Sequence, residues 1–454
     1  MYPQITEAER FPILTDAGRK LLYRMRQHSH APIWNWPNGE QLNESGLSKV
    51  QSFAQQLHLE QITAPQRPSW LDDFVSFCAS DVPFYRRRLG VLSHASRFSF
   101  ENVPTCNRED LAPRVWDFVP DSVSLDKVIV FSTSGTTGHP ARMLSNPATA
   151  ACGVPMIERA IRHCGVELPR GPESVAITNV AAYRGAFTTA IVVAYLEEAG
   201  CVRVNLDPSA WRQPSDCVRF INEWKSPVWL GDPIAYALTL KMDVDHAPKA
   251  IVSSIMRMPD LLGAQLQARF GCPVLDLYAL TEVGILAVRT ERGHEVLPHD
   301  VYVEIVDLDD REVRDGQRGE VTVTCARNPY MPLLRYRTGD FASMERVDGR
   351  VFLVGLEGRS PVLFPLPSGR VVHSMEVTRL MRTIPILQYS LHQAKDGSFK
   401  FGYRGLFDTL LLKHRLSQLL EHPESLEFIE LPAPTITTTK VLEYRSNVTR
   451  PLIG

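Results

Sequence analysis

The sequence of 454 residues lacks several features that would assign it to a class at once. No apolar run approaches the ~20 residues that a membrane-spanning helix needs. The eight cysteines include no Cys-x-x-Cys pair, which argues against a zinc knuckle or a disulfide framework and favours a reducing compartment. The net charge of −2 provides no basic surface for nucleic acid or for an acidic membrane. These absences, with a polar and acidic N-terminus, predict a cytoplasmic protein that binds neither nucleic acid nor membrane.

The length and the composition indicate a globular protein with more than one domain. A chain of 454 residues exceeds what one ordinary hydrophobic core accommodates. Hydrophobic residues make up 44% of the sequence and charged residues 22%, which is typical of globular proteins. We find no internal repeat and no low-complexity tract, so a repeat architecture is not expected.

One loop is rich in glycine and hydroxyl groups and follows a predicted strand at residues 128–131. Glycine lets backbone N–H groups approach a phosphate closely, and hydroxyl groups add donors without adding charge. The loop is not a Walker motif, because His139 and Pro140 stand where a lysine and a hydroxyl residue would follow. A flexible linker is the alternative, but such linkers rarely follow an aliphatic strand. The predicted polyphosphate-binding residues are Ser132, Thr133, Ser134, Gly135, Thr136, Thr137 and Gly138.

Strands and helices alternate after this loop, which predicts an α/β fold with a parallel sheet covered by helices. The first 65 residues are polar and mostly helical in pattern. Glycine at 271 closes one of the predicted helices. The predicted strands are residues 175–178, 202–206 and 273–277, and the predicted helices are residues 187–198 and 260–270.

The pattern changes after residue 301 to short strands separated by acidic turns. Strands are predicted at residues 301–306, 312–314, 320–324 and 351–354. Residues 355–359 have the composition of a hinge, and the remaining ~95 residues suffice for a small α+β domain. We therefore expect an N-terminal helical extension at residues 1–65, a core domain at 66–357 and a C-terminal domain at 358–454.

Several ordered segments match one family. They are Pro83-Phe84-Tyr85-Arg86 with residues 103–105 and 108–111, the loop at 132–138, Tyr183-Arg184-Gly185-Ala186-Phe187, Tyr278-Ala279-Leu280-Thr281-Glu282, residues 319–321, Tyr336-Arg337-Thr338-Gly339-Asp340, and Gly358-Arg359. One such motif is weak evidence, but this many in order are strong. Over about residues 70–360 the chain resembles the adenylate-forming (acyl-CoA synthetase) superfamily, in particular its phenylacetate–CoA ligase branch. The resemblance implies a large adenylate-forming domain of helix-covered sheets with a small β-rich subdomain, followed by a small C-terminal lid.

The resemblance also implies the chemistry, in which a carboxylate attacks the α-phosphorus of ATP. Because both reactants are anionic, the protein must position them and neutralise charge. Thr281 and Glu282 would act on the α-phosphate and its Mg²⁺, with Glu282 as the metal ligand, since magnesium prefers hard oxygen atoms. The alternative for Glu282 is a carboxylate that interacts with the N-terminus of a helix.

Four further residues are assigned to the nucleotide by the same resemblance. Tyr278 would stack on adenine, and Asp340 would accept hydrogen bonds from the ribose hydroxyls. Arg359 would reach the ribose or the phosphates, and Lys440 would stabilise the charge that develops during adenylation. Taken singly, each also fits an ordinary structural role, as a core aromatic, a turn aspartate or a solvated charge.

The acid-binding pocket is implied at Tyr183, Ala186 and Phe187, together with Val283 and Gly284. Small and aromatic side chains suit a flat apolar acid such as an aryl carboxylate. Buried packing explains the same residue types equally well.

The sequence departs from the family pattern in four places. Residues 253–257 lack the glycine expected beside adenine, and Ala279 replaces a motif glycine. Pro361 follows the predicted hinge and should stiffen it, because proline fixes φ. Thr439 replaces the glycine expected before Lys440. His28 and His30 could suggest a metal, but without further ligands they are predicted to be surface histidines.

Three functions remain open from the sequence. The first is an ATP-dependent ligase that passes the acyl group of a small carboxylic acid to a thiol, with coenzyme A as the expected acceptor. The second is a ligase of secondary metabolism that uses an amine, a hydroxyl or a carrier protein as acceptor. The third is a nucleotide- or adenylate-binding protein that has lost turnover. The sequence also leaves a homodimer open.

Overall fold

The computed structural model describes residues 5–59, 67–90, 100–132, 142–254, 256–297, 300–358, 362–381, 383–405, 407–421, 426–434, 441 and 443–448. Within these ranges the helices are α1 (Glu7–Arg10), α2 (Asp16–Arg26), α3 (Glu44–Leu59), α4 (Leu71–Asp81), α5 (Pro83–Leu89), α6 (Arg108–Leu111), α7 (Pro147–Ala151), α8 (Gly153–Arg162), α9 (Asp216–Trp224), α10 (Pro233–Thr239), α11 (Asp260–Phe270), α12 (Ser374–Met381) and α13 (Thr409–Leu420). Short 3₁₀ helices are η1 (Phe100–Asn102), η2 (Val115–Phe118), η3 (Ala194–Leu196) and η4 (Pro208–Ala210).

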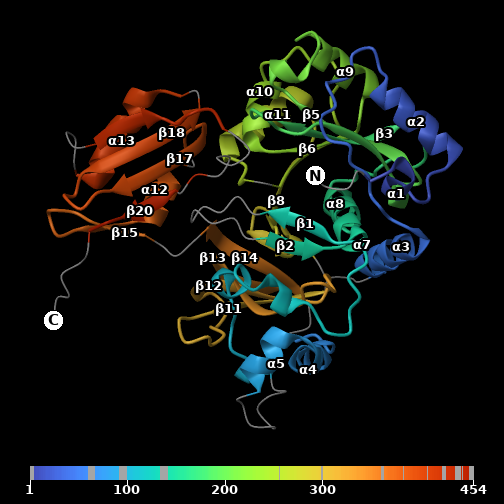
Figure 1. Cartoon of the computed structure of the whole chain (residues 1–454). Helices are drawn as coiled ribbons and strands as arrows, with labels where there is room; N and C mark the ends of the chain where they lie inside the picture. The colour runs from blue at the N-terminus through green and yellow to red at the C-terminus, as the bar shows by residue number, and fades with distance from the viewer. Residues whose placement is uncertain are drawn as a thin grey trace.

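The strands of the described residues form one large sheet and three small ones (Figure 1). They are β1 (Ile129–Ser132), β2 (Arg142–Ser145), β3 (Val175–Ala181), β4 (Thr189–Val193), β5 (Ala199–Asn205), β6 (Val228–Gly231), β7 (Ala250–Ser253), β8 (Val274–Leu280), β9 (Gly284–Arg289), β10 (His294–Val296), β11 (Val301–Val306), β12 (Arg318–Cys325), β13 (Leu333–Val347), β14 (Arg350–Gly358), β15 (Leu363–Pro365), β16 (Val371–His373), β17 (Ile386–Gln393), β18 (Phe399–Gly405), β19 (Leu426–Glu430) and β20 (Tyr444–Ser446). The large sheet has the order β11-β12-β13-β14-β10-β9-β8-β7-β6-β3-β5-β4.

One half of the large sheet is parallel, as the sequence predicts. Strands β8, β7, β6, β3 and β5 run in the same direction. Helices α9, α10 and α11 connect β5 to β6, β6 to β7 and β7 to β8. Strand β3 is buried along almost its whole length because both faces of the sheet are covered, which suits its aliphatic sequence. Helix α11 has the predicted bounds, and Gly271 ends it with a φ of +65°. The predicted α/β class is therefore confirmed.

The predicted helix at residues 187–198 is wrong. Strand β4 occupies this stretch and pairs antiparallel with β5 at the edge of the sheet, followed by η3. The β-branched residues Thr189, Ile191 and Val192 lose side-chain freedom in a helix and pack well in a strand. Because β5 has a free side at the edge of the sheet, these residues could pair with it, and their strand propensity favoured a strand over a helix. The predicted strand at 312–314 is also wrong, since only a single bridge joins Val306 to Glu312.

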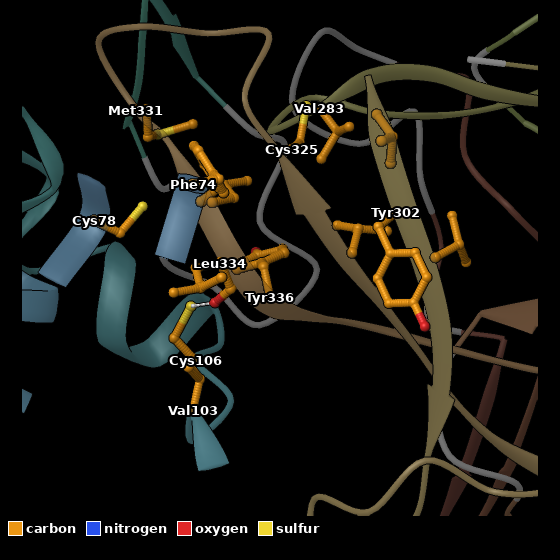
Figure 2. Close-up of a cluster of buried hydrophobic side chains, with 14 of the residues drawn as sticks. Phe74, Cys78, Val103, Cys106, Val283, Tyr302, Cys325, Met331, Leu334 and Tyr336 are labelled. Carbon is orange, nitrogen blue, oxygen red and sulfur yellow. Dashed lines mark hydrogen bonds between the residues drawn. The ribbon is translucent and has the colours of Figure 1, made fainter. Parts of the chain in front are cut away.

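The other half of the large sheet is antiparallel and runs from β8 to β11. Its long strand β13 pairs with β12 on one side and with β14 on the other. One face packs on a hydrophobic cluster that includes Tyr336, Val283 and Cys106, part of which Figure 2 shows. The Cys106 thiol donates to the backbone oxygen of Leu334 at 3.5 Å. Strand β14 continues through Gly358, so the predicted hinge residues 355–358 lie within a strand.

The N-terminal segment covers the edge strand β4. Helix α2 packs the side chains of Leu21, Leu22 and Met25 into the cluster that contains the inner residues of β4 and β5. Figure 1 shows α2 beside the part of the sheet that contains β3 and β5. Beyond α2, the backbone N–H of Trp36 donates to the oxygen of Thr188 at 3.2 Å. The Thr188 hydroxyl donates in turn to the oxygen of Ile33 at 2.7 Å. The segment thus packs on the core domain as part of its structure.

The C-terminal region has an α+β core of its own. A four-stranded sheet with the order β19-β18-β17-β20 packs against α12 and α13. Its interior is formed by residues such as Phe364, Phe401 and Leu416. This region lies to one side of the large domain in Figure 1, near α10 and α11. The exact boundaries at 65/66 and 357/358 stay predictions.

None of the helices in the described ranges is both long and apolar enough to cross a bilayer.

Replacing Leu22 by alanine should destabilise the protein. Leu22 is only 2% exposed, and a buried Leu→Ala change costs about 2–5 kcal/mol of the free energy of unfolding. The matched control is Tyr23→Ala on the same helix, because Tyr23 is 67% exposed and should change that free energy by less than about 0.5 kcal/mol. Denaturant unfolding monitored by tryptophan fluorescence measures both. Equal stability of the two variants would contradict the packing of α2 on β4.

Candidate functional site

Two of the residues predicted to bind the nucleotide contact each other. Tyr278 lies near the end of β8, and its hydroxyl donates to Oδ2 of Asp340 on β13 at 2.6 Å. Burial, and then the negative charge of Asp340, raise the pKa of Tyr278 well above its ordinary value, so the phenol stays protonated as a donor. The sequence predicted that both residues bind one nucleoside, and the structure places them together.

An irregularity within β13, held by three hydrogen bonds, presents Asp340. Its backbone N–H donates to the hydroxyl of Thr338, which donates to the oxygen of Val321 on β12 at 2.8 Å. Gly339 has a φ of +79°, and its N–H donates to Glu320 at 2.9 Å. A residue with a side chain rarely adopts that φ, which explains the Thr-Gly-Asp order. Asp340 also lies opposite Gly358 on β14, where an added Cβ would come within 3.4 Å of Oδ1.

Glu282 lies in the tight turn between β8 and β9. Its Oε1 accepts a hydrogen bond from the Tyr336 hydroxyl at 3.2 Å. Burial, and then the charge of Glu282, raise the pKa of Tyr336. A strand and not a helix follows Glu282, so the alternative of a carboxylate at the N-terminus of a helix is wrong. Thr281 is exposed beside it, and Gly284 closes the turn with a φ of +84°.

Two successive side chains join this turn to the hairpin that carries the predicted phosphate loop. Arg327 donates from Nη1 to the oxygen of Val283 at 3.0 Å, and Asn328 donates from Nδ2 to the oxygen of Leu144 at 2.6 Å. Leu144 lies on β2, which pairs antiparallel with β1. Arg327 is itself fixed by two hydrogen bonds to Asp300, of 2.8 and 2.7 Å. The strand that leaves the loop and the turn that carries Glu282 are therefore anchored at one point.

Several predicted residues lie outside the described residues. Of the phosphate loop, Ser132 ends β1 and pairs with Arg142, whereas residues 133–138 are not described. The same holds for Arg359, for Pro361 and for Lys440. Their assigned roles stay predictions. The described strands on either side of the loop, β1 and β2, pair antiparallel.

The residues predicted to line the acid pocket fall into two groups. Tyr183 and Phe187 meet at one cation, because Arg203 donates from Nη2 to the Tyr183 hydroxyl at 3.1 Å and lies 4.0 Å from the centre of the Phe187 ring. Ala186, which lies between them in the sequence, is buried. The second group, Val283 and Gly284, follows β8, which is separated from β3 by β7 and β6 in the sheet. Val283 is part of the hydrophobic cluster in Figure 2.

Sequence reasoning missed the residues that hold these groups in place. Arg203 was detectable, since a lone arginine between two valines in a buried strand is unusual. Tyr336 lies in a recognised motif but carried no assigned role. Arg327 and Asn328 gave no signal, because their function depends on contacts with Val283 and Leu144, which are distant in sequence.

The family implies a magnesium ion, and the residues present supply only some of the ligands that such an ion needs. The described residues contain no group of three or more histidine, cysteine, aspartate or glutamate side chains that could hold a metal ion. Magnesium, however, usually takes one or two carboxylates and completes its shell with phosphate oxygens and water. Glu282 suits this mode because it is a single, partly accessible carboxylate.

The two N-terminal histidines are not surface residues as predicted. His28 and His30 are partly buried and face α9, where they lie 3.0 Å from Glu223 and 2.8 Å from Asp216. They attach the N-terminal segment to the core domain.

Two of the departures from the family pattern lie in described residues. Ala279, which replaces a motif glycine, does not adopt a positive φ, so the alanine is tolerated there without backbone strain. In the stretch that lacks a glycine, the Ser253 hydroxyl donates to the oxygen of Met256 at 3.1 Å.

Replacing Tyr278 by phenylalanine should weaken nucleotide binding. The variant keeps the ring but removes the hydroxyl that orients Asp340, and a hydrogen bond contributes about 0.5–1.5 kcal/mol, or about 2- to 10-fold in affinity. Calorimetric titration with AMP measures the change. Tyr302→Phe is the control. Tyr302 lies on β11, and its hydroxyl also donates to a carboxylate, that of Glu312, outside the candidate nucleoside site. An unchanged AMP affinity in Tyr278→Phe would contradict the nucleoside site.

Comparison with known proteins agrees with this arrangement. The family model described as AMP-binding enzyme matches residues 1–329. A phenylacetate-coenzyme A ligase of Aromatoleum evansii is 27% identical over 320 residues, or 66% of this chain and 68% of the relative. A phenylacetate-coenzyme A ligase of Pseudomonas putida is 26% identical over 290 residues, or 58% of this chain and 62% of the relative.

Solved structures share the fold. A 2-hydroxyisobutyryl-CoA ligase in the postadenylation state has a TM-score of 0.61 at 16% identity and covers 82% of this chain and 88% of its own. The same ligase in the thioesterification state has a TM-score of 0.52 at 17% identity and covers 88% and 90%. Together with the family match over most of its length, the chain thus belongs to the AMP-binding enzymes, as an adenylate-forming ligase related to the phenylacetate–CoA ligases.

Proposed function

We propose that this enzyme activates an aryl or small apolar carboxylic acid as its acyl adenylate and then transfers the acyl group to the thiol of coenzyme A. The observation that carries the proposal is the hydrogen bond of 2.6 Å between Tyr278 and Asp340, beside the turn that bears Glu282. An aromatic ring and an orienting carboxylate at this distance suit a nucleoside, and a neighbouring carboxylate suits the cation of its phosphates.

Each of the predicted site residues would have a separate role in adenylation. Tyr278 would stack on adenine, Asp340 would hold the ribose hydroxyls, and the loop at 132–138 would hold the leaving pyrophosphate. Glu282 would hold Mg²⁺, which neutralises phosphate charge when it is bound. The hydrogen bond from Tyr336 keeps the Glu282 carboxylate facing the site. Arg359 and Lys440 would approach from the C-terminal domain. Positioning and charge neutralisation are the main contributions that phosphoryl-group chemistry needs from a protein.

An aryl acid is favoured by the aromatic pair Tyr183 and Phe187 and by the relatives, which are named phenylacetate-coenzyme A ligases. Coenzyme A is the favoured acceptor for the same reason. An amine or a carrier protein as acceptor gains no support from the N-terminal segment, because α2 and residues 33–36 of that segment are used in packing against β4 and its neighbours.

Isotope exchange between pyrophosphate and ATP tests the first step, and thioester formation tests the second. The purified enzyme is incubated with ATP, magnesium and a panel of aryl and aliphatic acids, and then with coenzyme A. Acid-dependent exchange followed by an acyl-CoA product is expected. Exchange without a thioester would assign another acceptor, and the absence of exchange with every acid would refute adenylation.

Replacing Glu282 by glutamine should lower the exchange rate by about 100-fold or more, because the loss of one transition-state electrostatic contact typically costs about 10²–10³ in rate. The fold should be retained, since the side chain is only partly buried and its amide can still accept from Tyr336. Glu291→Gln, which removes an exposed carboxylate from the turn after β9, is the control. Full exchange activity in Glu282→Gln would exclude the assigned role.

A further inference from the structure

Three polar atoms without a hydrogen-bond partner lie in one row across the edge of the large sheet. They are Oδ1 of Asn179 on β3, Nε of Arg203 on β5 and Oγ1 of Thr189 on β4, and all three are buried. In the strand register, Asn179 pairs with Arg203 on one side and Thr189 pairs with Arg203 on the other. Paired residues of neighbouring strands point to the same face of a sheet. The three side chains therefore form one polar row on one face.

The row lies beside the predicted acid pocket. On β5, Arg203 comes two residues before the end of the strand, where the carboxyl ends of the parallel strands meet. Ligands of open α/β sheets bind at this edge. The Arg203 guanidinium contacts both Tyr183 and Phe187, at 3.1 Å from the Tyr183 hydroxyl and 4.0 Å from the centre of the Phe187 ring. The row and the aromatic pair are thus joined through one side chain.

Packing alone does not account for the row. A buried polar atom without a partner costs about 1–3 kcal/mol, and such atoms are rare in native proteins. Three of them at one level of neighbouring strands indicate that a group from outside the chain completes them. Valine at 189 and leucine at 179 would have fitted the strands without this cost.

One carboxylate near Arg203 is already engaged elsewhere. Asp232, at the end of β6, senses that charge, but its Oδ1 already accepts from the N–H groups of Ile234 and Ala235. Burial raises the pKa of Asp232, although these N–H donors and the charge of Arg203 act to lower it. Asp232 thus serves the start of α10, and the Nε–H of Arg203 is left for another acceptor.

We propose that Asn179, Thr189 and Arg203 bind a second oxygen function of the acid, a hydroxyl or a carboxylate on the part remote from the activated carboxyl group. The proposal rests on the proposed function and specifies its substrate class. Arg203 offers a cationic N–H donor, Thr189 a hydroxyl and Asn179 a carbonyl acceptor. An unsubstituted phenyl or alkyl group satisfies none of these atoms, whereas an oxygen substituent satisfies donors and acceptor together.

The test compares matched acids in the pyrophosphate exchange assay. Phenylacetate, its ring-hydroxylated forms and its ring-carboxylated forms are used with the whole enzyme, and kcat/KM is measured for each. The wild-type enzyme should favour an oxygen-substituted acid by about 10-fold or more, because a site built to hydrogen-bond a substrate rejects the analogue that lacks the group. The hydroxylated and carboxylated forms reveal which oxygen function is preferred.

Variants then assign the preference to the row. Arg203→Gln and Thr189→Val should each lower kcat/KM for the preferred acid by about 10-fold, mainly through KM. Thr189→Val leaves the contacts of Arg203 with Tyr183 and Phe187 in place, so it should change kcat/KM for the unsubstituted acid by less than about 2-fold. Thr189→Val keeps the β-branched shape that β4 requires, so it remains informative if Arg203→Gln does not fold. Arg212→Gln, which removes an exposed arginine after β5, should leave both values unchanged.

The outcomes separate the two proposals. Equal kcat/KM for substituted and unsubstituted acids would overturn the role of the row while leaving adenylation intact. An equal loss for all acids in Thr189→Val would show a structural role only and would also overturn it. The absence of exchange with every acid would overturn the proposed function, and this inference with it.

Discussion

The arrangement of the site depends on the ion pair between Arg327 and Asp300. This pair is largely buried, at 6% and 17% exposure of the two side chains, and it fixes the guanidinium so that Nη1 reaches the oxygen of Val283. Removal of one partner of a buried pair leaves an uncompensated charge, which typically costs about 3–5 kcal/mol. Asn328 follows directly and holds β2 through Leu144. One turn between β12 and β13 thus sets the distance between the β1–β2 pair and the turn that bears Glu282.

The same turn leads into β13, which supplies the next parts of the site. Tyr336 and Asp340 lie four positions apart on this strand and reach Glu282 and Tyr278 respectively. Such a spacing would place both side chains on one face of a regular strand, and the left-handed turn at Gly339 adjusts the second of them. The proposed adenylate-forming site is therefore assembled mainly from contacts between β13 and the β8–β9 turn.

Motifs that occupy consecutive positions were predictable from the sequence, and contacts between distant segments were not. Tyr278 and Asp340 were assigned to one nucleoside because each lies in a recognisable local pattern. Helix α11 was predicted with its exact bounds because its apolar spacing and its closing glycine agree. Arg327 escaped prediction because nothing near it in sequence reveals that Val283 will lie 3.0 Å away.

The misassigned stretch at 189–193 has a physical explanation of the same kind. An apolar run bounded by glycine is compatible with a buried helix or a buried strand, and β-branched content favours the strand. The decisive factor was the vacant side of β5, which is a property of the assembled sheet. The polar row of Asn179, Thr189 and Arg203 could not be predicted for this reason, since it exists only once β4 takes its place.

The segment that covers β4, formed by α2 and residues 33–36, precedes β4 in the sequence, and this order has a consequence for biosynthesis. Unpaired edge strands invite pairing with other chains, and β4 is a short, uncharged and β-branched strand of that kind. Because ribosomes release the chain from its N-terminus, α2 and residues 33–36 emerge more than a hundred residues before β4. The covering segment is therefore already synthesised when β4 emerges from the ribosome. It can pack on β4 at once, which protects neighbouring nascent chains on one polysome from pairing through this strand.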